Sequence, residues 1–282
     1  KKGISFLPKK WILAICLVSI AGNTPATQPP KSGKAYVVSN AHLDTQWLWT
    51  VRTSIIDYIP RTIYQNLALI HDYPDYIFNF EGAVKYNWMK EYYPLDYEKV
   101  KEAIKNGRWH VSGSSWDAND VNVPSPESSF RNILLGQEFY KKEFGLKSTD
   151  IFLPDCFGFG YTLPSIAKHC GLIGFSTQKL GWRKKPFYGD SKIPFTIGRW
   201  KGIDGAELIC ALDCGSYVHN FKDDDLTKDN DLIQRVERDP MHTAYRYFGA
   251  GDRGGSAMPV SAMAIEKAQV SGDGPIEIVC AS

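Results

Sequence analysis

The chain has 282 residues, 43% of them hydrophobic, so it is long enough to bury the core of one large domain or two small ones. Its formal net charge is +2, but four lysines and no acidic residue precede residue 31, so the rest of the chain carries a net charge of about −2. This balance argues against the strongly basic surface that is typical of nucleic-acid binding.

The first thirty residues follow the pattern of a secretory signal peptide. A basic stretch ends at Lys10, an apolar run extends from Trp11 to Ile20, and candidate cleavage sites follow at Ala21 and Ala26. The apolar run is shorter than the roughly 20 residues that a membrane-spanning helix needs. We therefore expect residues 1–30 to be a bacterial-type signal peptide with its spacer. The mature protein is then periplasmic or extracellular, with no stable membrane span after cleavage.

Strand-like and helix-like segments alternate after this leader. β-Branched and aromatic runs indicate the strands, and apolar positions at helical spacing indicate the helices. In chain order, the sequence predicts a strand at 35–39, a helix at 53–71, a strand at 76–80, a helix at 95–105, a strand at 109–112, a helix at 128–144, a strand at 151–153 and a helix at 162–169. This alternation predicts an α/β fold with a mostly parallel sheet and flanking helices. Beyond Gly181 the pattern loosens into loops and short strands.

Polar and aromatic side chains follow the predicted strands at the point where each strand ends. Because the carboxyl ends of parallel strands meet at one edge of a sheet, we expect these residues to converge although they are far apart in the sequence. They are His42, Asp44, Glu81, Trp116, Asp120 and Asp155.

His42 and Asp44 stand two positions apart directly after the first predicted strand. In an extended segment both side chains point the same way, so an imidazole and a carboxylate can reach one metal ion. A capping aspartate beside a hydrogen-bonded histidine is the alternative interpretation.

Asp155 follows the strand at 151–153 and Pro154, with Gly158 and Gly160 close behind it. A carboxylate on such a strand-to-helix turn lies at the rim of a pocket, where it can bind a metal or attack a sugar. The alternative is an ordinary helix N-cap.

Three groups of residues occur in a particular order along the chain. They are His42-Leu-Asp44 with Trp47, then Gly107-Arg-Trp109 leading to Gly113 and Trp116, and then Asp155-Cys-Phe-Gly158. Further stretches of the same pattern are Pro124 to Arg131, Ser176 to Leu180, Arg199 to Gly205 and Tyr247 to Gly255. The ordered set resembles glycoside hydrolase family 38, the zinc-dependent α-mannosidases. The resemblance implies that residues 31–282 are the N-terminal catalytic domain of that family, with a mostly parallel sheet or a distorted β/α barrel.

The resemblance also implies roles for individual residues. His42 and Asp44 would be zinc ligands, and Asp155 would be both a zinc ligand and the catalytic nucleophile. Trp47 would pack against the sugar that the zinc holds. Asp252 is placed where the family has its general acid/base, although a turn aspartate bonded to backbone amides is the alternative. The candidate residues lining the sugar site are Glu81, Trp116, Asp120, Asp213 and Tyr217.

The sequence departs from the family pattern in several respects. A further histidine completes the family's zinc site, and neither His219 nor His242 stands in that context, so we expect one Zn²⁺ per site with its fourth protein ligand beyond residue 282. Residues 31–282 contain no counterpart of the family's helical bundle and β-sandwich domains, so we expect them to be an incomplete, truncated catalytic domain whose own activity is open. Phe159 stands where many relatives have a small polar residue or a histidine.

The function implied by the resemblance is hydrolysis of terminal α-linked mannose by a retaining mechanism, from an α-mannoside oligosaccharide or a glycoprotein glycan. One alternative is a zinc-dependent deacetylase or amidohydrolase, which also places His and Asp at the strand ends of an α/β barrel. It is disfavoured because the six histidines include no HxxxH pair. Another alternative is a truncated, non-catalytic remnant that binds carbohydrate.

Overall fold

The computed structural model describes residues 31–181, 193, 195–213, 215–222 and 224–282. The segment interpreted as a signal peptide, residues 1–30, lies outside them. Within the described part of the chain, no helix is both long enough and apolar enough to cross a lipid bilayer.

A five-stranded parallel sheet is built around β1 (Gly33–Ala41). On one side, β1 pairs with β8 (Thr243–Ala250) from Lys34 to Ala41. On the other side, the first half of β1 pairs with β9 (Ile276–Cys280) and the second half with β2 (Phe78–Glu81). β3 (Trp109–Ser112) pairs with β2. Two strands therefore share one edge of β1, and β2 and β3 are offset toward its carboxyl end.

A second sheet has four strands in the order β4-β5-β7-β6. β4 (Asp150–Phe152), β5 (Gly174–Thr177) and β7 (Glu207–Leu212) are parallel, and β6 (Ile197–Lys201) forms an antiparallel hairpin with β7. The hairpin turns at Gly205, whose φ of 85° is unstrained only for glycine. Apart from this hairpin, the strands of both sheets are parallel.

The two sheets meet at two seams and form a distorted barrel. At the first seam, just after β3, the Ser114 amide donates to the Asp150 carbonyl of β4 at 3.0 Å. At the second seam, the carboxylate of Asp213, just after β7, accepts from the Tyr247 amide of β8 at 2.9 Å. Isolated hydrogen bonds replace strand pairing at these seams. The expected α/β fold with mostly parallel strands and flanking helices is confirmed.

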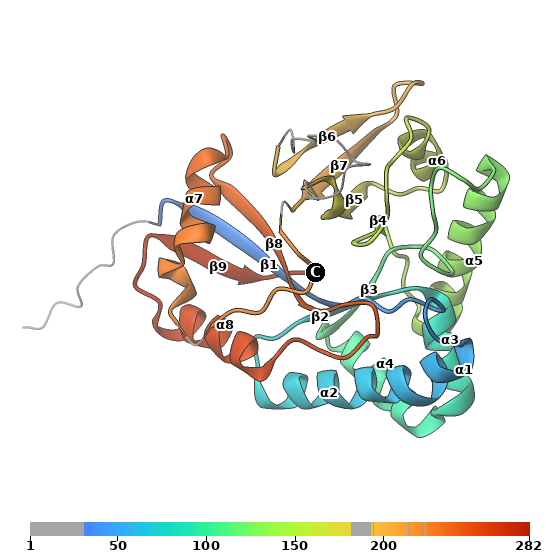
Figure 1. Ribbon diagram of the computed structural model, residues 1–282, viewed down its shortest axis with the longest axis horizontal. Helices are drawn as coiled ribbons and strands as arrows, with labels where there is room; N and C mark the ends of the chain where they lie inside the picture. The colour runs from blue at the N-terminus through green and yellow to red at the C-terminus, as the bar shows by residue number, and fades with distance from the viewer. Residues whose placement is uncertain (1–30, 182–192, 194, 214, 223) are drawn as a thin grey trace, which may run out of the picture.

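Helices cover the outer faces of the sheets (Figure 1). Proline stands in the first turn of several of them, where its missing N–H is not needed. The helices are α1 (Val51–Thr53), η1 (Ser54–Tyr58), α2 (Ile59–Asp72), α3 (Ala83–Tyr92), α4 (Pro94–Lys105), α5 (Pro126–Phe144), α6 (Leu163–His169), η2 (Lys179–Gly181), η3 (Leu226–Lys228), α7 (Asn230–Arg238) and α8 (Pro259–Ser271). The four helices predicted from apolar spacing are present with similar bounds. Beyond Gly181 the expected short strands are present, but the helices α7 and α8, which were not predicted, lie there too.

Three groups of buried side chains hold the sheets and helices together. Alternate residues of β1, among them Ala35, Val37 and Ala41, pack against the helices on the outside of the first sheet. A second group lies between the second sheet and α6. The third group lies between the two sheets and contains Val38, Phe152 and Tyr247 from their strands and Tyr217 from the loop after β7. Because apolar and aromatic side chains fill this interior, the loops at the carboxyl ends of the strands are left to form a polar site.

Candidate active site

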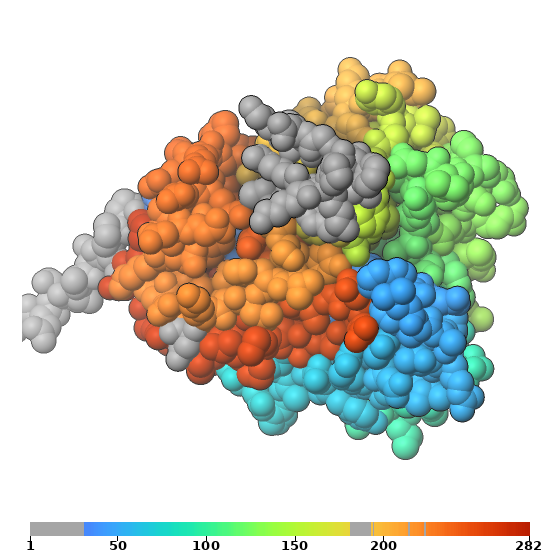
Figure 2. Space-filling model, in the orientation of Figure 1, coloured from blue at the N-terminus to red at the C-terminus, as the bar shows by residue number. Residues whose placement is uncertain are grey.

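The loops after β1 and after β8 are joined by backbone hydrogen bonds. The His42 amide donates to the Ala250 carbonyl at 3.1 Å, and the Gly254 amide donates to the His42 carbonyl at 3.0 Å. The Asp44 amide donates to the Asp252 carbonyl at 2.9 Å. On the molecular surface, the blue segment around α1 adjoins the red-orange segment that follows β8 (Figure 2). The chain therefore stays extended beyond β1, which places His42 and Asp44 on the same side.

His42, Asp44 and Asp155 offer one nitrogen and two oxygen atoms that lie within 4.8 Å of one another. His42 Nε2 is 3.2 Å from Asp44 Oδ1 and 3.9 Å from Asp155 Oδ2. Ligand atoms about 2.0 to 2.2 Å from a tetrahedral zinc ion are about 3.4 Å from one another. An imidazole and two carboxylates are also donors that zinc accepts. The residues present therefore fit a zinc ion.

The second ring nitrogen of His42 faces a buried ion pair. His42 Nδ1 is 2.9 Å from Glu81 Oε1, and the same oxygen accepts from Lys85 Nζ at 2.9 Å. Burial alone would raise the pKa of Glu81, but Lys85 and His42 outweigh burial and lower this pKa to about 2. Burial alone would lower the pKa of His42, but its hydrogen bonds to Asp44 and Glu81 raise it to about 9. Asp44 and Glu81 therefore both stabilise the His42 imidazole in the position that it has in the structure.

Asp155 follows β4 and is held by residues that follow β5. The Gln178 side chain donates to the Pro154 carbonyl at 3.0 Å. The ammonium group of Lys179 forms an ion pair with Asp155 Oδ1 and lies 4.6 Å from the centre of the Phe157 ring. A neighbouring cation stabilises the ionised carboxylate, which is the form that binds metals and attacks carbon.

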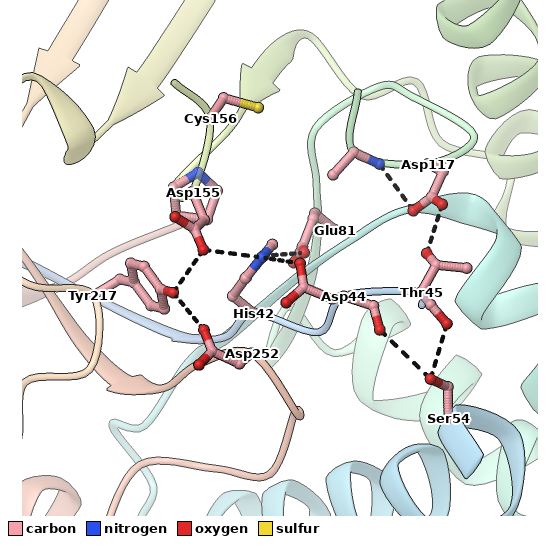
Figure 3. Close-up of polar contacts among 12 residues, drawn as sticks. His42, Asp44, Thr45, Ser54, Glu81, Asp117, Asp155, Cys156, Tyr217 and Asp252 are labelled. Carbon is pink, nitrogen blue, oxygen red and sulfur yellow. Dashed lines mark hydrogen bonds and ion pairs between the residues drawn. The ribbon is translucent and has the colours of Figure 1, made fainter. Parts of the chain in front are cut away.

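The hydroxyl of Tyr217 joins Asp155 to Asp252 (Figure 3). It lies 2.9 Å from Asp155 Oδ2 and 2.8 Å from Asp252 Oδ1, so these two oxygens are no more than about 5.7 Å apart, the sum of the two contacts. Burial raises the pKa of Tyr217, and Asp252 raises it further, so the hydroxyl keeps its hydrogen. The Tyr217 ring also meets the His42 ring edge-on, with 5.5 Å between centroids. One phenol thus connects the metal cluster to a further carboxyl group.

A cavity of about 160 Å³ lies at this cluster. It is lined by His42, Asp44, Ala118, Asn119, Asp120, Leu153, Pro154, Asp155, Cys156 and Phe157. The Asp120 carboxylate accepts from the amides of Asn122 and Val123 at 2.7 and 3.0 Å, which fixes its own loop at the cavity wall. Asp120 is therefore placed to line a bound ligand.

Cys156 stands next to Asp155 and also lines the cavity. Its Sγ donates to the Asn119 carbonyl at 3.0 Å. Burial raises the pKa of Cys156 to about 12, and the acids around it add to this rise. The clustered donor atoms among the described residues belong to His42, Asp44 and Asp155, and the Cys156 thiol is not one of them.

The two tryptophans that were expected at the sugar site, Trp47 and Trp116, lie in different surroundings. Trp47 is 59% exposed and meets Trp49 edge-on with 5.9 Å between ring centroids, so part of its ring is open to a sugar. Trp116 packs edge-on against Phe139 of α5 with 5.9 Å between centroids. Neither tryptophan is among the described residues that line the cavity. The structure therefore does not bring Trp116 to the site.

Two acids that were expected to contact the sugar are buried. Asp213 is 0% exposed and forms ion pairs with Arg235 and Arg246 at the seam between β7 and β8. Glu81 is 2% exposed and lies behind His42. In this structure neither carboxylate has the exposed surface with which to contact a sugar hydroxyl directly.

Two lysines of the site were not predicted from the sequence. Lys179 lies within the stretch Ser176 to Leu180, and Lys85 lies in α3. A single lysine normally indicates a solvated surface, so neither residue stands out alone. The spacing of four between Glu81 and Lys85 matches that of a helical ion pair and is the one signal that was available.

Two carboxyl groups that share one hydroxyl, beside a His-Asp-Asp cluster at the strand ends of an α/β barrel, are an arrangement that fits a glycoside hydrolase. Comparison with known proteins gives the family. The sequence profile described as "Glycosyl hydrolases family 38 N-terminal domain" matches residues 32–271. The chain therefore belongs to glycoside hydrolase family 38.

Individual proteins show the same similarity. The chain is 36% identical over 176 residues to α-mannosidase G of Dictyostelium discoideum, which covers 62% of this chain and 16% of that protein. It is 31% identical over 221 residues to human α-mannosidase 2C1, which covers 78% of this chain and 20% of that protein. The crystal structure of an α-mannosidase from Enterococcus faecalis has a similar fold, with a TM-score of 0.72 and 20% identity over 89% of this chain and 28% of that one.

The comparisons also bear on the length of the chain and on its alternative functions. The chain spans about a fifth or less of the length of the curated relatives described above. Membership of family 38 argues against the alternative of a zinc-dependent deacetylase or amidohydrolase.

Proposed function

We propose that the chain forms the N-terminal part of a zinc-dependent α-mannosidase, which removes terminal α-linked mannose from glycans with retention of configuration. One relationship carries the proposal, namely the contact of the Tyr217 hydroxyl with both Asp155 and Asp252. Retaining glycosidases hold their two carboxyl groups about 5 to 5.5 Å apart, whereas inverting enzymes need about 6.5 to 9.5 Å. The limit of about 5.7 Å set by the two Tyr217 contacts supports retention.

Asp155 is the proposed nucleophile. One of its oxygens attacks the anomeric carbon while the bond from that carbon to the leaving oxygen breaks, and water later hydrolyses the glycosyl ester. Lys179 pairs with Oδ1 and Tyr217 contacts Oδ2. These two groups orient the carboxylate, and the Lys179 ammonium lies beside its negative charge.

Asp252 is the proposed general acid and base. Asp252 lies within hydrogen-bond distance of the Tyr217 hydroxyl, which also contacts the proposed nucleophile. As the acid it gives a hydrogen to the leaving glycosidic oxygen in the first step, and as the base it takes one from the attacking water in the second.

His42, Asp44 and Asp155 would hold the zinc ion, since their donor atoms have the spacing of a zinc site. When bound, the zinc supplies electrostatic attraction that orients neighbouring sugar hydroxyls, for which the axial 2-hydroxyl of mannose is suited. Trp47 would pack against the sugar, and Asp120 would line the cavity. The proposed substrate is an α-mannoside oligosaccharide or a glycoprotein glycan.

The test combines metal analysis with product stereochemistry. We expect the purified protein, expressed as its gene encodes it, to hold about one zinc per molecule by elemental analysis, and to release 4-nitrophenol from its α-mannoside. Proton NMR should show α-mannose as the first product, and Asp155→Asn should abolish turnover. The control is Asp72→Asn, which changes an exposed acid at the end of α2. A first product with the β configuration would contradict retention. A chain that holds zinc and mannoside but turns none over would favour the carbohydrate-binding alternative.

Export is a separate proposal and rests on the basic and apolar pattern of residues 1–30. Sequencing the N-terminus of the protein recovered from its native host tests it. A start just after Ala21 or Ala26 would support cleavage, and a mature chain that still contains Trp11 would contradict it.

A further inference from the structure

We propose that Glu81 and Lys85 form a buried positioning pair that holds His42 as a metal ligand, an inference that rests on the metal site proposed above. β2 ends at Glu81 and α3 begins two residues later, so Lys85 lies about one helical turn beyond Glu81 and faces it. Glu81 Oε1 is 2.9 Å from both Lys85 Nζ and His42 Nδ1. The Glu81–Lys85 pair therefore contacts His42, the proposed metal ligand, and not the substrate.

The turn between β2 and α3 makes room for this pair. Gly82 has a φ of 87°, which side chains rarely adopt, and a Cβ atom there would lie 3.2 Å from Lys85 Nζ. The Val84 amide donates to the Trp116 carbonyl at 2.9 Å and fixes the first turn of α3. Glycine at this position thus lets the strand turn directly into the helix with the lysine folded back over it.

The Glu81–Lys85 pair determines which ring nitrogen of His42 carries the hydrogen. A histidine that binds metal through Nε2 carries its ring hydrogen on Nδ1, and a carboxylate that accepts this hydrogen fixes the tautomer and the ring orientation. Glu81 Oε1 lies at the position of such an acceptor, 2.9 Å from His42 Nδ1. His42 Nε2 then faces Asp44 Oδ1 at 3.2 Å and Asp155 Oδ2 at 3.9 Å, the two other donor atoms of the cluster.

Lys85 keeps the Glu81 carboxylate stable away from water. A buried carboxylate without a partner is strongly destabilised, and a buried cation at hydrogen-bond distance offsets much of this penalty. Glu81 is 2% exposed and Lys85 is 0% exposed. The negative charge behind His42 is therefore maintained by the protein and not by solvent.

A purely structural pair would join β2 to α3 without affecting metal binding. α3 provides a matched control for this possibility, because Lys90 on the same helix forms an ion pair with Glu143 of α5 at 2.7 Å. Lys90 is half-exposed at the surface. Lys90→Met therefore removes an ion pair from α3 without touching His42.

The experiment compares two double variants of the chain, Glu81→Gln with Lys85→Met and Glu81→Leu with Lys85→Met. Both remove the ion pair, but only glutamine keeps an oxygen that can accept from His42 Nδ1. Zinc affinity is measured by competition with a chromophoric chelator, and the thermal midpoint is measured without zinc. We expect the leucine variant to bind zinc roughly 10- to 100-fold more weakly than the glutamine variant at similar thermal midpoints. Lys90→Met should keep the wild-type affinity.

Equal zinc affinities in the two double variants would overturn the inference while leaving the metal site in place. A wild-type chain that binds no zinc would overturn the proposed metal site and this inference with it. If the leucine variant does not fold, the glutamine variant is compared with the wild type. We then expect about tenfold weaker zinc binding, because an amide accepts more weakly than a carboxylate. An unchanged affinity would overturn the inference.

Discussion

The amide of Asp44 donates to the carbonyl of Asp252 at 2.9 Å, so a proposed metal ligand and the proposed acid are joined through the backbone. Asp252 has a φ of 60°, a left-handed conformation that is uncommon outside glycine. Such conformations persist where the surrounding structure imposes them, and they are concentrated at functional sites. The position of the acid relative to the metal cluster therefore depends on the pairing of β1 with β8.

Asp252→Asn should retain the fold and lose acid catalysis. Asparagine accepts the left-handed conformation better than most residues, so the substitution adds little strain. We expect kcat to fall roughly 10²- to 10⁴-fold for a mannoside whose leaving group needs protonation. The fall should be much smaller for 2,4-dinitrophenyl α-mannoside, whose leaving group does not need it. Steady-state kinetics with both substrates measures this difference, and an equal loss for both would argue against the acid role.

Tyr217→Phe should lower turnover and leave the fold almost unchanged. Phenylalanine keeps the ring that meets His42 edge-on but removes the hydroxyl shared by Asp155 and Asp252. A hydrogen bond to a charged group contributes about 1.5 to 3 kcal/mol, so kcat/KM should fall roughly 10- to 100-fold. The control is Tyr161→Phe, since Tyr161 is exposed. An unchanged kcat/KM would show that the phenol does not position the two carboxyl groups.

The convergence of His42, Asp44 and Asp155 was predictable because each follows a strand of a parallel sheet. Parallel pairing brings the carboxyl ends of strands to one edge whatever their separation in the sequence. The same rule fails for Trp116, whose ring packs against Phe139 of α5. The end of a strand determines where the backbone goes, but local packing determines where a side chain points.

The sequence also did not reveal which charged side chains are buried. Glu81 and Asp213 were expected to line the sugar site, yet each is buried beside basic groups, Lys85 for Glu81 and two arginines for Asp213. α3 was also not predicted, because a lysine, Lys85, is among its buried positions and interrupts the apolar pattern. Partners of this kind become visible only when the fold brings them together.

Lys179→Met should reduce activity through the Asp155 carboxylate. The Lys179 ammonium forms an ion pair with Asp155 Oδ1, and both side chains are largely buried. Removing one preorganised charge from an active site lowers turnover by roughly 10²- to 10³-fold. The control is Lys201→Met, at an exposed position on β6. Kinetics with 4-nitrophenyl α-mannoside checks the prediction, and a loss confined to KM would contradict a role in orienting the nucleophile.

Asp213→Ala should destabilise the protein and leave substrate binding unchanged. Its carboxylate is 0% exposed, pairs with Arg235 and Arg246, and accepts from the Tyr247 amide where β7 meets β8. Removing one partner of a buried ion pair costs roughly 3 to 5 kcal/mol, because the other charge is left uncompensated. Asp231→Ala is the matched control: it removes an exposed partner of Arg235, which should cost less than about 1 kcal/mol.

Urea unfolding of the two variants measures this difference. For Asp213→Ala we expect a lower unfolding midpoint with an unchanged dependence on urea, as for a simple loss of stability. The KM for 4-nitrophenyl α-mannoside should equal that of the wild type at temperatures where the variant is folded. A raised KM with normal stability would instead place Asp213 at the sugar and reverse the assignment made from its burial.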